Sequence, residues 1–319
     1  MRILECAPLT DLALVHLVRH ANGFAPFEAF MASYETHGPG REHDLVLLFK
    51  GFPDAAATEP FLERAACSRP AALHVDDEGV DLTAYLRAAA RLDQRYVGFV
   101  NSFSEILVDD WLELLSAPVA AGAGAAGATG SWGGGLSYKL YQAGLPGGYA
   151  DVFPDARAVR LAMHEIGGAR YRGDVVHWIG NAAYTIRDLR LLSLFPAVHL
   201  RTNAFVIERE RLLALRVGRL GGKRAAYQLE SGRGNLTTQL TALGRPPVIV
   251  DRHGAARRGA EWPDADVFWQ DHQQDLLVAD NQTRSYIDGP PHHREVLSRF
   301  AWGLAARPSF GAGERQPRH

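Results

Sequence analysis

Short apolar runs alternate with amphipathic stretches through the first third of the chain. Residues 12–18 form a nearly continuous apolar run that is too short for a typical helix, which predicts a buried strand. The same reasoning predicts further strands at 44–49, 72–75 and 95–100, and helices at 24–34, 60–67, 82–92 and 111–115. Strands and helices in alternation indicate an α/β fold, in which helices flank a mostly parallel sheet on both faces.

Polar side chains follow each of the four predicted strands at its carboxyl end. They are Arg19 and Asn22, Lys50, Asp76 and Asp77, and Asn101, Ser102 and Glu105. Open parallel sheets bind their ligands beyond the carboxyl ends of the strands. The sequence therefore predicts a binding site at this edge, although a solvated charge at a strand end is the ordinary alternative for each residue.

Residues 116–135 are rich in alanine and glycine, and Gly122, Gly124 and Gly127 form a literal G-x-G-x-x-G. A dinucleotide-binding fingerprint directly follows a core strand and opens a helix, whereas this motif follows a break at Pro118. We interpret the segment as a strand and loop in which the backbone closely approaches another part of the chain. The motif leaves an NAD(P)-dependent oxidoreductase open as an alternative.

The composition is that of an ordinary globular protein of 319 residues, with 47% hydrophobic and 22% charged residues. The formal net charge of −2 gives no indication of a nucleic-acid partner. No apolar run reaches the roughly 18 residues of a membrane-spanning helix. Glu5 and Asp11 also interrupt the apolar stretch that a signal peptide would need. We expect a cytoplasmic protein with no integral membrane segment, in which Cys6 and Cys67 are reduced thiols, and a homo-oligomer stays open.

The stretch from Arg95 to Glu105, together with Asp110-Trp111-Leu112, resembles the fourth-strand segment of family 2-type glycosyltransferases of the GT-A fold. In that family the strand typically ends in Phe-Leu-Asn, an acidic metal motif follows, and Gly-Trp-Leu opens a helix. Residues 275–283 are similar to a closing segment of a bacterial subgroup that acts in polysaccharide synthesis. The resemblance covers residues 10 to 290.

The resemblance implies a hexosyltransferase-like enzyme that moves a sugar from a nucleotide-sugar donor to a saccharide or other hydroxyl acceptor. It implies one GT-A domain over residues 1–306, with a Rossmann-like nucleotide-sugar-binding half at 10–115 and an acceptor-binding and catalytic half at 116–306. Residues 307–319 are rich in glycine, arginine and proline, which predicts a disordered tail. In the resembled fold the nucleotide sugar is expected to contact Arg19, Asn22, Lys50, Asp76, Asp77, Asn101 and Ser102.

The resemblance also implies a divalent metal, Mn²⁺ or Mg²⁺, but the Asp-x-Asp motif of the family is not intact. The matching stretch, Asn101-Ser-Phe-Ser-Glu105, holds one acidic residue. Glu105 and His272 are the expected ligands, since these ions accept carboxylate and water oxygens and lean on substrate phosphates. The incomplete motif leaves open a non-catalytic, glycosyltransferase-like protein that binds nucleotides.

Glu230, within Gln228-Leu-Glu-Ser-Gly232, resembles the acidic residue of the family's catalytic loop. A carboxylate near the acceptor hydroxyl can act as a general base, so the resemblance implies a direct displacement with inversion. A helix-capping or ion-paired glutamate is the alternative interpretation. By the same resemblance, the acceptor is expected to contact His199, Arg201, Asn203 and Trp132.

Overall fold

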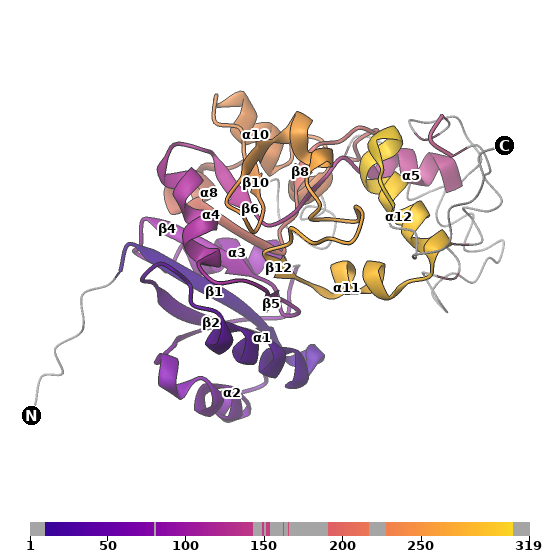
Figure 1. The fold of residues 1–319 in the computed structure, drawn as a ribbon. Coiled ribbons are helices and arrows are strands. Elements are labelled where there is room, and N and C mark those ends of the chain that lie inside the picture. The colour runs from indigo at the N-terminus through magenta and orange to yellow at the C-terminus, as the bar shows by residue number, and fades with distance from the viewer. Residues whose placement is uncertain are drawn as a thin grey trace, which may run out of the picture.

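A computed structural model describes residues 10–79, 81–142, 149, 151–153, 162, 165, 191–216 and 228–308. Within these residues the main sheet has 8 strands in the order β11-β10-β6-β9-β4-β1-β2-β3 (Figure 1). The strands are β1 (Leu12–Arg19), β2 (Asp44–Lys50), β3 (Ala71–Val75), β4 (Tyr96–Val100), β6 (Ala125–Gly127), β9 (Ala204–Glu208), β10 (Val248–Val250) and β11 (Ala256–Arg258). β9 and β11 run antiparallel to their neighbours, and the other pairs are parallel. The predicted α/β class, a mostly parallel sheet flanked by helices, is confirmed.

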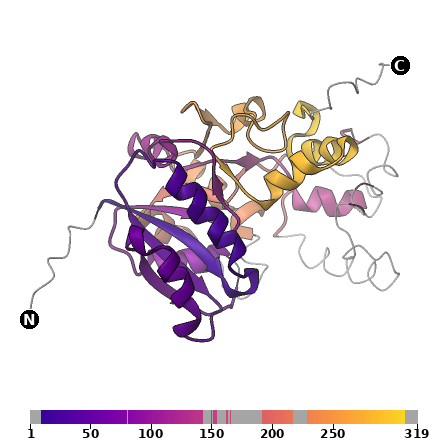
Figure 2. The ribbon, with the colours of Figure 1, turned by 60° about the horizontal axis from the view of Figure 1, so that its bottom comes forward.

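Helices cover both faces of this sheet (Figures 1 and 2). One face carries α1 (Ala25–Thr36), α2 (Glu59–Arg64) and α4 (Trp111–Ala120), and the other carries α3 (Asp81–Ala89), α8 (Arg209–Ala214) and α10 (Leu236–Ala242). Alternate side chains of β1 serve the two cores: Leu14 packs with the α1 layer and Val15 with the α3 layer. A strand buried on both faces is apolar throughout, which is why its sequence pattern predicted it well.

The last third of the chain returns to the carboxyl end of β4. β12 (Val278–Ala279) pairs with β5 (Glu105–Ile106), and β8 (His199–Leu200) pairs with β7 (Gly130–Ser131), both antiparallel. α11 (Asn281–Asp288) and α12 (Pro291–Trp302) follow β12, and α12 lies beside α5 (Gly135–Gln142) (Figures 1 and 2). Short 3-10 turns complete the described elements: η1 (His20–Asn22), η2 (Ala56–Thr58), η3 (Ala66–Ser68), η5 (Gly259–Asp264) and η6 (Gly303–Ala305). The ends of the parallel strands therefore face segments that are distant in sequence.

The glycine-rich segment does not have the geometry of a dinucleotide-binding fingerprint. Gly122 and Gly124 lie in the turn after α4, and Gly127 ends β6, so a helix precedes the motif and a strand ends it. A Cβ atom at Gly124 would clash with the carbonyl oxygen of Arg245. Close backbone approach explains these glycines, and the feature that favoured an oxidoreductase is accounted for by packing.

The described residues extend to Pro308, two residues past the domain end predicted at residue 306. The backbone N–H of Arg307 donates to Oε1 of Gln270 at 2.6 Å, and its guanidinium pairs with Asp271 at 2.9 Å. Residues 309–319, the remainder of the expected tail, lie outside the described residues.

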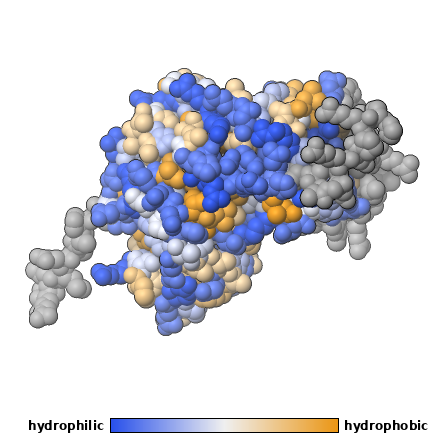
Figure 3. All heavy atoms as spheres, viewed as in Figure 1, coloured by the Kyte–Doolittle hydropathy of each residue, from blue (hydrophilic) through white to orange (hydrophobic). Residues whose placement is uncertain are grey.

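None of the described helices has the length and apolar character needed to span a membrane. The face drawn in Figure 3 is mainly hydrophilic, with smaller apolar areas near its middle.

His16 lies within β1 and is fully buried. Its ring stacks on Phe30, with 3.7 Å between the ring centroids and 4° between the planes. Neither ring nitrogen has a hydrogen-bond partner among the described residues. Burial lowers the pKa of His16 from 6.5 to about 3, because an imidazolium at this position would lose its hydration.

The substitution His16→Leu is expected to raise the free energy of unfolding at neutral pH by about 1 kcal/mol, because two unsatisfied polar atoms leave the core. Between pH 6.5 and about 3 the unfolded chain binds a proton at His16 that the folded chain does not. Wild-type stability therefore falls as pH falls, by up to about 1.4 kcal/mol per pH unit from this group, and the variant should lose less. Urea unfolding at neutral and acidic pH measures both effects.

The control for this substitution is His253→Leu, at an imidazole that is 71% exposed. It should leave the acid sensitivity of the wild type unchanged. Equal loss of stability on acidification in wild type and His16→Leu would contradict the assignment.

Candidate functional site

A polar cavity of about 300 Å³ lies beyond the carboxyl ends of β1 and β4. Seven residues that the sequence predicts as functional line it: Arg19, Asn22, Asn101, Ser102, Arg201, Asn203 and Glu230. They come from two neighbouring strand ends, from the connection between β8 and β9, and from a helical stretch at 228–231. The fold therefore gathers these residues at the edge where an open parallel sheet binds its ligands.

The wall of this cavity holds two buried donors that lack a hydrogen-bond partner among the described residues. They are Nε of Arg19 and Nδ2 of Asn203. An unsatisfied buried group costs about 1–3 kcal/mol, and such groups are rare in folded proteins. Both atoms are closed to solvent in this structure, so an acceptor oxygen in the cavity would meet them only after the side chains rotate.

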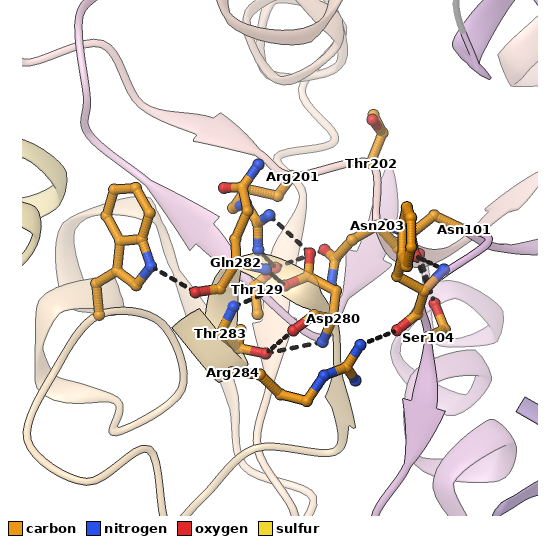
Figure 4. Close-up of polar contacts among 12 residues, drawn as sticks. Asn101, Ser104, Thr129, Arg201, Thr202, Asn203, Asp280, Gln282, Thr283 and Arg284 are labelled. Atoms are coloured by element: carbon orange, nitrogen blue, oxygen red, sulfur yellow. Dashed lines mark hydrogen bonds and ion pairs between the residues drawn. The ribbon is translucent and has the colours of Figure 1, made fainter. Parts of the chain in front are cut away.

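A buried ion pair between Arg201 and Asp280 joins three connections at this cavity (Figure 4). Nη2 of Arg201 lies 2.8 Å from Oδ2 of Asp280, and the two side chains are only 10% and 1% exposed. The other oxygen of Asp280 accepts the N–H groups of Gln282 and Thr283 and caps α11. Burial alone would raise the pKa of Asp280, but the Arg201 charge and the two amide hydrogen bonds lower it overall.

The Arg201 guanidinium has two further contacts that fix its plane. It lies over the ring of Phe268, 4.0 Å from the centroid. Its Nη1 donates to the hydroxyl of Thr129 at 3.2 Å, and that hydroxyl donates to Oδ1 of Asn203 at 2.6 Å. This chain of bonds orients the Asn203 amide and leaves its Nδ2 as the unpartnered donor.

The two aspartates predicted after β3 have different positions. Asp77 pairs with Arg19, with 3.0 Å between Oδ1 and Nη2, so it contacts a residue of the cavity wall but does not itself line the cavity. Asp76 instead pairs with Arg87 of α3 at 2.6 Å, and that hydrogen bond lowers the pKa of Asp76. Asp76 is absent from the cavity wall, so its predicted contact with the nucleotide is not supported by its position.

Lys50 is buried beneath the cavity and does not line it. Its Nζ donates to the carbonyl of Gly79 at 2.9 Å and lies 3.8 Å from Oδ1 of Asp81, which does line the cavity. Burial lowers the pKa of Lys50 and raises that of Asp81, and the charge of Glu230 adds to the rise at Asp81. Lys50 therefore positions the start of α3, in place of the direct nucleotide contact that was expected.

The stretch expected to hold a metal is engaged in protein contacts. Oδ1 of Asn101 accepts from the N–H of Phe103 at 2.9 Å and from the hydroxyl of Ser104 at 3.1 Å. The hydroxyl of Ser102 donates to a carbonyl of β1 at 2.8 Å. Oε1 of Glu105 lies 2.8 Å from Nη1 of Arg284, so a guanidinium occupies the carboxylate that was expected to bind Mn²⁺ or Mg²⁺.

His272, the second expected ligand, is exposed and lines neither this cavity nor the one beside it. Among the described residues, the metal-capable side chains of the predicted site do not form a group of three within ligand distance. Glu105 and His272 therefore do not come together as a pair of ligands in this structure, and the expectation of a divalent ion stays a prediction.

A second cavity of about 350 Å³ adjoins the first, and Arg201, Glu230 and Gln282 line both. Its wall is largely apolar and includes Phe268, Trp269, Leu297 and Phe300. Glu230 thus lies where a polar and an apolar cavity meet.

The carboxylate of Glu230 is half-buried, and its Oε1 accepts the hydroxyl of Thr202 at 2.9 Å. Within the described part of the chain it has no ion-pair partner, in contrast to Asp77, Asp81 and Asp280. Glu230 is therefore a carboxylate at the meeting of the two cavities that no described cation engages, and a general base needs a carboxylate that a substrate can reach.

The residues predicted to bind the acceptor are divided between cavity and core. His199 lines the second cavity, and its Nδ1 lies 2.7 Å from the carbonyl of Ala197. Burial lowers the pKa of His199 to about 4, so the ring is neutral near pH 7, with its proton on Nδ1 and Nε2 as an acceptor. Trp132 lines neither cavity; its Nε1 donates to the carbonyl of Gly259, so its expected acceptor contact is not supported by its position.

Comparison with known proteins gives only partial likenesses. No protein-family model matches the chain, and no curated protein matches it. A structure of S. aureus TarS is 13% identical, with a TM-score of 0.30 over 36% of this chain and 20% of that one. GalNAc-T7 with UDP, GalNAc and Mn²⁺ is 17% identical, with a TM-score of 0.30 over 36% of this chain and 22% of that one.

The mannosyltransferase PcManGT from Pyrobaculum calidifontis, in complex with GDP-Man and Mn²⁺, is 13% identical, with a TM-score of 0.31 over 40% of this chain and 38% of that one. The matched part thus spans 20% to 38% of the length of these chains. Function is therefore inferred from the site and not from these neighbours.

Several lining residues were not predicted from the sequence, namely Asp81, Thr202, Asp280, Asn281 and Gln282. A local signal for Asp280 was present, since Asp280-Asn-Gln-Thr283 is a capping box in front of a helix. That signal predicts the start of α11 but says nothing about a partner 79 residues earlier in the chain.

The substitution Asp280→Asn is expected to lower the free energy of unfolding by about 3 kcal/mol, because Arg201 keeps a buried charge without a counter-ion. Asparagine caps a helix as well as aspartate does, so this variant isolates the ion pair. Asp280→Ala removes the cap too and should cost about 1 kcal/mol more. Urea denaturation measures both changes.

Asp288→Asn, at an exposed position in the last turn of the same helix, is the matched control and should not destabilise the protein. If the free energy of unfolding of Asp280→Asn lies within about 0.5 kcal/mol of the wild-type value, the ion pair with Arg201 does not stabilise the fold.

Proposed function

We propose that this chain is a GT-A-type glycosyltransferase that transfers a sugar from a nucleotide-sugar donor to a hydroxyl acceptor. The observation that carries the proposal is the junction at Glu230, where a polar cavity at the strand ends meets an apolar one. A transferase needs two adjoining substrate sites with a base between them, and this arrangement supplies them.

The polar cavity suits the donor. A nucleoside diphosphate presents oxygen acceptors and negative charge, and the wall holds two guanidinium groups, those of Arg19 and Arg201, together with the amide of Asn203. Arg19 is 32% exposed, and its bond to Asp77 leaves other N–H groups for the phosphates. The same cationic groups stabilise the charge that develops on the leaving phosphate.

Glu230 is the proposed general base. The acceptor hydroxyl oxygen attacks the anomeric carbon of the donor sugar, its proton passes to Glu230, and the bond from that carbon to the phosphate oxygen breaks. The nucleoside diphosphate leaves with the electron pair, and a single displacement of this kind inverts the anomeric centre. Since the Thr202 hydroxyl engages Oε1, the second oxygen of the carboxylate is the one that takes the proton.

The second cavity suits the acceptor. Trp269 stacks on Phe268, with 4.4 Å between the ring centroids, and both line this cavity. Aromatic faces pack against the apolar faces of sugar rings, and the neutral His199 offers Nε2 as an acceptor for a sugar hydroxyl. We therefore propose that the acceptor is a saccharide, as it is in polysaccharide synthesis.

Calorimetric titration with UDP-, GDP-, dTDP- and CMP-sugars tests the donor site. One of these nucleotide classes is expected to bind, and Arg19→Ala should weaken that binding about tenfold or more, because a charge-assisted contact to phosphate is lost. Arg95→Ala, at the opposite end of β4, is the control and should bind like the wild type. Absence of binding for all four classes would refute the donor assignment.

Turnover of the Glu230→Gln variant tests the base. The rate of nucleoside diphosphate release in the presence of acceptor is expected to fall by about 10²- to 10⁴-fold, while donor affinity stays the same. Glu210→Gln, at an exposed position on α8, should keep wild-type turnover. Unchanged turnover in Glu230→Gln would exclude Glu230 as the base, and donor binding without any transfer by the wild type would favour the non-catalytic alternative.

A further inference from the structure

Three metal-capable side chains meet outside the two cavities. They are Glu165, His292 and His293, whose ligand atoms all lie within 4.8 Å of one another. Nε2 of His292 lies 2.7 Å from Oε2 of Glu165, and Nε2 of His293 lies 2.8 Å from the same oxygen. Hydrogen bonds from the two rings lower the pKa of Glu165, so its carboxylate is charged.

The cluster is open to solvent and close to the geometry of a metal centre. The side chains of His292, His293 and Glu165 are 57%, 17% and 42% exposed, so an ion can reach them. A tetrahedral Zn²⁺ holds nitrogen and oxygen ligands at about 2.0–2.1 Å, which puts the ligand atoms roughly 3.3 Å apart. The separations of 2.7 and 2.8 Å are near that spacing, and small rotations of these side chains make up the difference.

We propose that Glu165, His292 and His293 bind a divalent transition-metal ion, with Zn²⁺ favoured by the donor set. Two imidazoles and one carboxylate leave the fourth position of a tetrahedral ion to water. Each ring nitrogen that donates to Glu165 gives up its proton when it binds the ion, so binding releases protons. Nothing in this inference depends on the proposed transferase activity.

The position of the cluster gives the ion a structural role. His292 and His293 lie in the first turn of α12, while Glu165 belongs to a segment whose Ala162 packs with Val296 and Phe300. Phe300 also lines the second cavity. A metal at this site ties Glu165 to the first turn of α12 and braces the helix that forms a wall of that cavity.

Zinc titration of the full chain, made without a histidine tag, tests the site. We expect one Zn²⁺ per chain, a rise in Tm on adding Zn²⁺, and a binding heat that varies with the ionisation enthalpy of the buffer because protons are released. Co²⁺ as a probe should give the visible absorption of a tetrahedral site. Glu165→Gln and His293→Ala should each weaken Zn²⁺ binding about tenfold or more and abolish the rise in Tm.

The matched control is His253→Ala, which removes an exposed histidine paired with a single carboxylate, Asp275. It should bind Zn²⁺ as the wild type does. The Tm of each variant without metal shows that it folds. No saturable binding by the wild type would overturn the proposal, and so would wild-type affinity in Glu165→Gln, which would reduce the site to a histidine pair.

Discussion

The site depends first on the buried ion pair of Arg201 and Asp280. These residues lie in the β8–β9 connection and before α11, and the Thr129 hydroxyl from the β6–β7 connection bonds to the same guanidinium. A charge that is 10% exposed and another that is 1% exposed cannot separate without several kcal/mol of desolvation penalty. The pair and its bond to Thr129 therefore fix three connections relative to one another: β6–β7, β8–β9 and the one between β12 and α11. Arg201 also lines both cavities.

Around this pair, cations and carboxylates from different strand ends neutralise one another. Arg19 pairs with Asp77 at the ends of β1 and β3, Lys50 with Asp81 at the end of β2 and the start of α3, and Arg284 with Glu105 across α11 and β5. Within the described residues, Glu230 is the carboxylate of the cavity wall that this scheme leaves without a cation. The ion pairs of the strand edge therefore leave Glu230 free of a described cation, and this is one observation behind its proposed role as general base.

The sequence was sufficient for the parts of the fold that are encoded locally. β1 and β2 are buried on both faces, so their apolar runs marked them directly, and their polar ends located the edge of the cavity. The contacts that the sequence could not supply are long-range: Arg201 to Asp280 spans 79 residues, and Arg284 to the carbonyl of Phe103 spans 181. Lys50 and Asp76 are likewise held by partners elsewhere in the chain, Gly79 and Arg87, and neither lines the polar cavity. Glu105 was expected to be free for a metal, but it pairs with Arg284, which is also distant in sequence. The sequence also did not single out His16 as a buried ionisable residue, because one histidine within an apolar run does not change the strand pattern.

The Arg284–Glu105 pair also bears on how donor charge is balanced. An ion at Glu105 would have to displace a guanidinium 2.8 Å away. The side-chain oxygen of Asn101 already accepts two hydrogen bonds, and the hydroxyl of Ser102 is directed at a carbonyl of β1, to which it donates. In the proposed donor complex, the charge of the diphosphate would then be balanced by the cations of the chain. Arg201 cannot move, because its counter-ion is buried, whereas the Arg19–Asp77 pair is half-exposed and contributes at most about 1 kcal/mol, so it separates at little cost. The cavity therefore holds one fixed and one adjustable arginine, and the proposed donor site uses both for its phosphates.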